Sequence, residues 1–155
     1  MVDSFFPVSV PREDPEELRS LEDAQGALAG SVRALLDLTV RTEVDPEEMR
    51  AVAAEVDALT ARLADRATDG PLGLQKCSDG RIRDHGNPAV GMRNPIAPPL
   101  RLRREPDHSA HTEFELGAAY EGPPGHVHGG MVAMVLDQVL GAVAASAGKP
   151  GLTAY

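Results

Sequence analysis

The sequence is poor in aromatic residues, in cysteine and in long apolar runs. Aromatic side chains make up only 3% of the 155 residues and tryptophan is absent, so aliphatic side chains must form the core. The single cysteine, Cys77, excludes an internal disulfide and fits a reducing compartment. The first residues, MVDSFFPVSVPRED, lack the basic and long apolar regions of a signal peptide. No run reaches the roughly 18 apolar residues of a membrane span. We therefore expect a cytoplasmic protein that does not bind membranes.

Positive charge is also scarce, because 15 Lys and Arg residues stand against 24 Asp and Glu residues, a formal net charge of −9. A surface this acidic repels phosphate backbones, so we expect no nucleic-acid partner. An anionic ligand would need a local basic patch. The candidates for such a patch are Arg101, Arg103 and Arg104.

Two amphipathic helices are predicted in residues 1–70. The sequence DPEE at residues 14–17 combines a capping aspartate, a proline at the first helical position and acidic residues in the first turn. We expect this helix to run to about Arg41. DPEE recurs at residues 45–48, and the helix after it has an apolar heptad seam: Met49, Val52, Val56, Leu59 and Leu63. The pair predicts an N-terminal arm and a helical hairpin. We favour a hairpin packed on its own domain over a dimerisation or regulatory arm.

The rest of the chain divides into a loop and the first part of a second unit. Residues 71–99 are dominated by Gly, Pro, Asn and Asp, which predicts a long loop. Residues 100–105 and 108–122 are expected to form two strands joined at a turn, with residues 100–155 as one folded unit. From Gly130 the run MVAMVLDQVLGAVAASAG is apolar almost all round, which predicts a buried helix.

Asp137 is the most informative residue, because it lies in the middle of that apolar helix. A buried carboxylate is costly unless it is paired or used, so a structural aspartate and a catalytic one are both open. His128, Gly129 and Gly130 stand just before the helix. Glycines at a helix start let a ligand approach free N–H groups, and the helix dipole attracts developing negative charge. This arrangement suits an oxyanion, although a plain Gly-rich turn is the alternative.

A metal site is the competing interpretation of the histidines in this region, which are His108, His111, His126 and His128. No carboxylate or cysteine falls at a ligand-like spacing with them, so we expect no metal. Thr153 follows the helix and would by itself be an ordinary residue of a strand.

Taken together, the run GPPGHVHGGMVAMVLDQVLG with GKPGLTAY after it resembles the hotdog-fold acyl-CoA thioesterases of the PaaI and THEM type. The match covers about residues 85–155. It implies an α+β hotdog fold, in which a curved antiparallel sheet wraps a central helix, here preceded by the helical hairpin. The resemblance also implies about three further strands after Tyr155. We therefore expect the natural chain to continue, or the open sheet edge to be covered in an oligomer.

The resemblance assigns a role to each matched residue. Gly129 becomes the oxyanion donor, His128 supports its loop, Asp137 becomes the general base or nucleophile, and Thr153 orients the attacking water. Gly122 stands where many relatives carry Asn or Gln. The implied activity is hydrolysis of an acyl-CoA to the free acid and coenzyme A. Coenzyme A is then part of the substrate, and no separate cofactor is expected.

A homo-oligomer, dimer or tetramer, is implied by the resemblance, with an active site shared between subunits. Helix geometry leads to the same arrangement, because Gly129 and Asp137 are eight residues and so about 12 Å apart along one helix. Two alternatives stay open. One is a hotdog hydratase or dehydratase in which His126 or His128 assists the acid. The other is a non-catalytic truncated hotdog chain that acts as a binding or dimerisation module.

Overall fold

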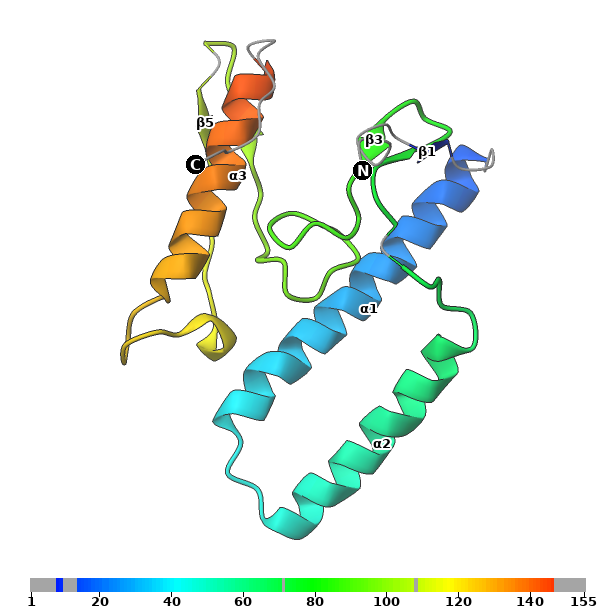
Figure 1. Ribbon diagram of the computed structural model, residues 1–155, viewed down its shortest axis with the longest axis vertical. Helices are drawn as coiled ribbons and strands as arrows, with labels where there is room; N and C mark the ends of the chain where they lie inside the picture. The colour runs from blue at the N-terminus through cyan, green and yellow to red at the C-terminus, as the bar shows by residue number, and fades with distance from the viewer. Residues whose placement is uncertain (1–7, 10–13, 71, 108, 147–155) are drawn as a thin grey trace.

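The computed structural model describes residues 8–9, 14–70, 72–107 and 109–146 (Figure 1). They form an α+β fold, as expected. The helices are α1 (Pro15–Arg41), α2 (Pro46–Ala64) and α3 (Gly129–Ser146), with a 3-10 turn η2 (Ala118–Tyr120). The strands are short: β1 (Val8–Ser9), β2 (Gln75–Lys76), β3 (Ile82–Arg83), β4 (Arg103–Arg104) and β5 (Ala110–His111). None of the helices in these ranges is long and apolar enough to cross a membrane.

Both N-terminal helices begin at the predicted positions. The Asp14 side chain accepts a hydrogen bond from the N–H of Glu16 at 2.8 Å, and the Glu17 carboxylate accepts one from the N–H of Asp14, which completes a capping box. The Asp45 carboxylate accepts from the N–H groups of Glu47 and Glu48 at 2.9 and 3.0 Å. Each aspartate thus satisfies backbone donors that a helix start leaves without partners.

Helix α1 packs against the rest of the chain. Leu18 and Ala29 on its inner face are both 4% exposed. Near its C-terminal end the helix contacts η2, where an Asp37 oxygen accepts the N–H of Ala118 at 2.7 Å. A β-carbon at Gly117 would lie 2.3 Å from that same oxygen, so the contact depends on a glycine there.

Helix α2 does not pack in this way. It runs antiparallel to α1 but stands apart from it (Figure 1), and none of its residues is buried. Its heptad seam is largely exposed, with Leu59 at 52% and Leu63 at 56%. The expected packing of the hairpin on its own domain is correct for α1 and wrong for α2.

Two strands of a small sheet, β2 and β3, lie in the segment that the sequence predicted as loop. Strand β2 pairs parallel with β1 and antiparallel with β3, where Gln75 lies opposite Arg83. Gly80 turns the chain between β2 and β3 with φ +80°, a conformation that favours glycine. Next to it, Asp79 binds the Arg83 guanidinium through two hydrogen bonds of 2.8 and 2.7 Å. Turn residues at 78–80 concealed two strands too short to show a pattern.

The two strands predicted after residue 100 are present only in part. Strands β4 and β5 pair antiparallel, with Arg103 opposite His111, and a turn at Pro106 and Asp107 joins them. The predicted continuation to residue 122 is wrong: residues 112–117 are irregular and residues 118–120 form η2. The alternation of apolar and acidic residues at 112–116 was not enough to make a strand, because no other described segment pairs with it.

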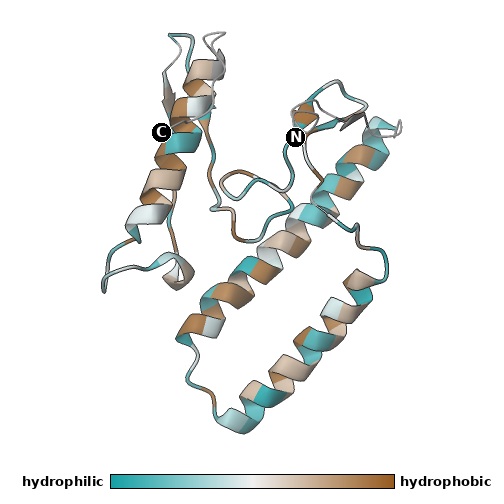
Figure 2. Ribbon diagram, viewed as in Figure 1, coloured by the Kyte–Doolittle hydropathy of each residue, from teal (hydrophilic) through white to brown (hydrophobic). Residues whose placement is uncertain are grey.

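Helix α3 is covered on one face. Val135 and Ala142 are each 6% exposed, and β5 contacts the helix. Val132, Leu136 and Leu140 form a stripe on the other face and are 45%, 55% and 67% exposed. Figure 2 shows how apolar this helix is along its length. Within the described chain, the expectation of a helix buried all round is therefore wrong.

Candidate active site

A tight loop leads into α3 and fixes where the helix begins. The N–H of Gly122 donates to the carbonyl of His126, and the N–H of His128 donates to the carbonyl of Tyr120, both at 2.9 Å. Gly125 has φ +74° at the tip, and its N–H donates to the Glu121 carboxylate at 2.7 Å. The chain therefore folds back on itself, and the backbone of His128 lies against Gly122.

This close approach explains the glycine at position 122. A β-carbon there would lie 2.8 Å from the Cα of His128, which is closer than real contacts allow. An Asn or Gln, which the resemblance to the hotdog thioesterases leads one to expect here, would collide with the loop backbone. In this chain, a side-chain donor at position 122 is replaced by closer packing of the loop.

The His128 side chain engages the helix start. Its Nδ1 accepts a hydrogen bond from the N–H of Gly130 at 3.0 Å, and its carbonyl accepts from Met131 at 2.9 Å. His126 Nδ1 lies 3.0 Å from the carbonyl of Pro124. One nitrogen of each ring is therefore within hydrogen-bonding distance of the backbone.

Gly129 is the first residue of α3. Among the described residues none accepts its N–H, and a β-carbon built on it would meet no atom within 4 Å. The N–H at the first position of an α-helix has no partner within the helix and points along the helix dipole. An open backbone donor at this place is suited to an anion or to a carbonyl oxygen that gains charge.

Asp137 lies on the same helix and is exposed, so the predicted burial of this residue is wrong. Eight residues of α-helix separate it from Gly129 by about 12 Å and turn its side chain by about 80° around the axis. One chain therefore does not bring the predicted base and the predicted oxyanion donor to a common point. Thr153 lies outside the described residues.

The other predicted polar groups do not gather into a cluster. Arg101 and Arg103 are exposed, and Arg104 contributes its backbone to β4. His111 Nδ1 lies 3.7 Å from a Glu105 oxygen, and His108 lies outside the described residues. Within the described ranges no group of three or more His, Cys, Asp or Glu side chains could hold a metal ion.

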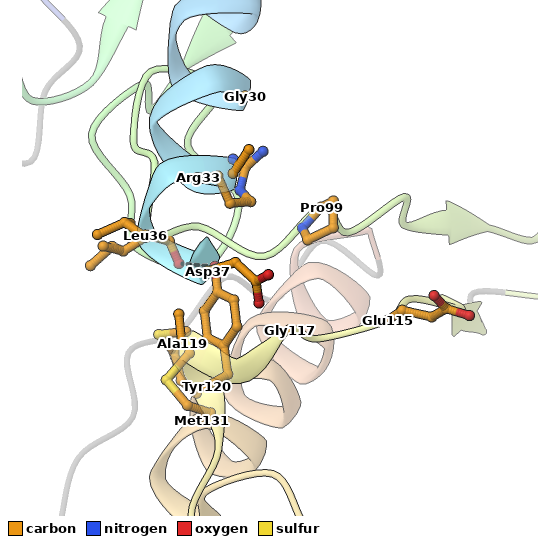
Figure 3. Close-up of a pocket in the computed structure, with 13 residues that line it drawn as sticks. Gly30, Arg33, Leu36, Asp37, Pro99, Glu115, Gly117, Ala119, Tyr120 and Met131 are labelled. Atoms are coloured by element: carbon orange, nitrogen blue, oxygen red, sulfur yellow. Dashed lines mark hydrogen bonds between the residues drawn. The ribbon is translucent and has the colours of Figure 1, made fainter. Parts of the chain in front are cut away.

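A pocket of about 580 Å³ beside the start of α3 was not predicted from the sequence (Figure 3). Helix α1, the segments around Ile96 and Tyr120, and Met131 and Met134 of α3 form its walls. The only sequence signal was a pair of small residues one turn apart, Gly30 and Ala34, in the middle of α1. Small residues on a helix face leave room for a neighbouring element or a ligand.

Comparison with known proteins finds similarity among solved structures. No protein-family model and no curated protein matches the chain. A crystal structure of a thioesterase superfamily protein superposes with a TM-score of 0.69 and 29% sequence identity, covering 95% of this chain and 72% of that one. Because the superposition includes almost the whole chain, it supports a hotdog-like α+β fold for this protein and a general thioesterase-like function. It also confirms the resemblance of the sequence to the hotdog thioesterases.

Proposed function

We propose that the protein hydrolyses an acyl-CoA thioester in the cytoplasm, with the chemistry of the PaaI and THEM type. The observation that carries this proposal is the open N–H of Gly129 at the start of α3, held in place by His128. This N–H can donate to the oxyanion that forms during thioester hydrolysis. A structural relative of this chain is a thioesterase superfamily protein. Arg101 and Arg103 are exposed, as residues that meet the coenzyme A phosphates would be.

In the proposed reaction Asp137 removes a proton from water as the water oxygen attacks the thioester carbonyl. The Gly129 N–H stabilises the resulting oxyanion, a contribution of about 3–4 kcal/mol for one such donor. The carbon–sulfur bond then breaks, and the coenzyme A thiolate takes the proton that Asp137 holds. Thr153 orients the water. Direct attack by Asp137, with an anhydride intermediate, is the variant of this route.

The proposed site is shared between two subunits. A carbonyl under attack must lie roughly 3 Å from both the oxyanion donor and the activated water, and the 12 Å along one helix is too long for that. Two antiparallel α3 helices related by a two-fold axis place each Gly129 beside the partner's Asp137. The exposed stripe at Val132, Leu136 and Leu140 supports such an assembly, because apolar surface of this kind is normally covered. Asp137 is also exposed, as a residue that faces a second subunit would be in a single chain.

The first test is the release of free thiol from acyl-CoA. Asp137→Asn should lower kcat by about a hundredfold or more with little change in acyl-CoA affinity. The matched control is Asp57→Asn on the exposed α2, which should keep full activity. Thr153→Ala should cost less than Asp137→Asn, since a hydroxyl that orients water does not take the proton. Near-normal hydrolysis by Asp137→Asn contradicts the proposal. Conversion of an enoyl-CoA without thiol release favours the hydratase, and binding without any turnover favours the non-catalytic module.

Subunit mixing tests the shared site. Inactive Asp137→Asn chains are combined with chains in which a bulky residue replaces Gly129. A mixed dimer then holds one intact site of two and should regain about half the activity per dimer. If heterodimers form and activity does not return, each chain holds its own site.

A further inference from the structure

The pocket beside α3 is lined by elements from both halves of the chain. Helix α1 forms one wall, and the η2 region with Met131 of α3 forms the facing wall (Figure 3). Its volume of about 580 Å³ lies in the range of small-molecule sites. The wall that α1 forms lies outside residues 85–155, which carry the family resemblance.

Three of the polar side chains around the pocket, those of Arg33, Asp37 and Tyr120, bond to protein groups, and a fourth, Glu115, is exposed. Arg33 Nε donates to the carbonyl of Ala97 at 3.0 Å, and the Tyr120 hydroxyl donates to the carbonyl of Ile96 at the same distance. Asp37 accepts from Arg41 and Ala118, and these hydrogen bonds hold the pKa of its carboxyl below the usual value. What remains for an occupant is mainly apolar surface.

That apolar surface includes aliphatic and methionine side chains together with small residues: Gly30, Ala34, Leu36, Ile96, Met131 and Met134. Methionine side chains adapt their shape to chains of different length. An apolar occupant would leave the polar network around Arg33, Asp37 and Tyr120 undisturbed.

We propose that this pocket receives the acyl chain of the thioester and that α1 sets the length of chain it accepts. The inference rests on the proposed function. Met131, which lines the pocket, follows Gly129 by two residues, about 3 Å along the helix axis, so part of the pocket wall lies within one helical turn of the proposed oxyanion donor. A carbonyl at Gly129 then directs its alkyl chain between α3 and α1.

Gly30 is the position at which the size of the pocket is most easily reduced by substitution. It lines the pocket, and a β-carbon added to it would meet nothing within 4 Å. A larger side chain therefore enters open space and competes with the substrate, while Gly→Leu within a helix raises helix propensity. Each substrate methylene that no longer reaches apolar surface lowers kcat/KM about fourfold, which corresponds to ~0.8 kcal/mol.

The experiment compares Gly30→Leu with Ala27→Leu, which adds similar bulk to an exposed position of the same helix. The kcat/KM values for acetyl-, butyryl-, octanoyl- and lauroyl-CoA are measured by thiol release. Gly30→Leu should lower the octanoyl-to-acetyl ratio about tenfold or more, and Ala27→Leu should leave it unchanged. A ratio that does not change in Gly30→Leu, or changes equally in both variants, overturns the acyl pocket.

A binding measurement separates this inference from the proposed reaction. A fluorescent fatty acid, cis-parinaric acid, should bind the full-length wild-type chain and Ala27→Leu alike, and bind Gly30→Leu about tenfold more weakly. Equal binding to all three proteins overturns the pocket assignment. If the selective loss of binding occurs in a protein that hydrolyses no acyl-CoA, the acyl pocket stands and the proposed hydrolysis fails.

Discussion

Helices α1 and α2 begin with the same four residues, DPEE, and carry comparable apolar stripes, yet they end in different environments. Leu18 and Ala29 of α1 are buried, and its polar groups reach the loops through Glu22 and Asp37. In α2 no residue is buried. Similar local sequence therefore produced two helices, of which one is part of the packed chain.

The difference lies in what faces each helix. Glu22 of α1 pairs with Arg83 of β3, and Gly117 lets the chain near η2 approach Asp37 closely. The apolar seam of α2 faces no comparable surface in the described chain, because its Leu59 and Leu63 remain more than half exposed. Amphipathic periodicity specifies that a face needs cover, and only the rest of the molecule determines what covers it.

The largest expected effect comes from one substitution made in both helices. Leu18→Ala should lower the free energy of unfolding by about 2–3 kcal/mol, because it leaves a cavity beneath α1. Leu59→Ala should lower it by less than about 0.5 kcal/mol, since that side chain is already half exposed. Urea unfolding followed by circular dichroism measures both values. A loss near 2 kcal/mol at Leu59 would mean that α2 is covered in solution and would favour its role as a dimerisation arm.

The helix caps give a smaller effect that sharpens the same contrast. Asp14→Ala removes the capping box of α1 and should lower the free energy of unfolding by about 1 kcal/mol. Asp45→Ala removes an equivalent cap from α2. Because α2 packs so little, we expect it to lose helical signal at its start while the urea midpoint stays in place. Equal shifts of the midpoint in the two variants would show that both helices unfold together with the core.

The smallest expected effect is a pH dependence on the side of the molecule where α1 packs. Burial, and next the positive charge of Arg93, lower the pKa of His85, against an opposing influence of Glu22 on α1. Arg83 acts in the same direction as Arg93, and Asp84 acts with Glu22. The unfolded chain then binds the proton more readily than the folded one. Stability should be complete above about pH 6.5 and should fall as the pH drops towards the lowered pKa of the folded state.

Replacing His85 by glutamine removes the titrating group and should make the urea midpoint nearly independent of pH in this interval. His111→Gln, at an exposed position, is the matched control and should leave the pH dependence as it is. The same slope in wild type and His85→Gln would assign the dependence to other groups.

The sequence by itself determined the helix starts, the turn at Pro106 and Asp107, and the run from His128 through Asp137 that resembles the hotdog thioesterases. These features are local: a capping aspartate acts on N–H groups two or three residues away, and a helical spacing places side chains along one axis. That is why the ends of α1 and the position of Gly129 at the start of α3 agree with expectation.

Only the tertiary structure decided which of these faces are covered. Burial of Asp137 and of all of α3 was expected from composition, but one described strand contacts the helix and the opposite stripe is exposed. The pairing of β1 with β2 and the pocket between α1 and α3 arise from contacts between residues far apart in the chain. Gly117 and Gly122 are glycines because Asp37 and His128 approach them closely, and such an approach has no local signature in the sequence.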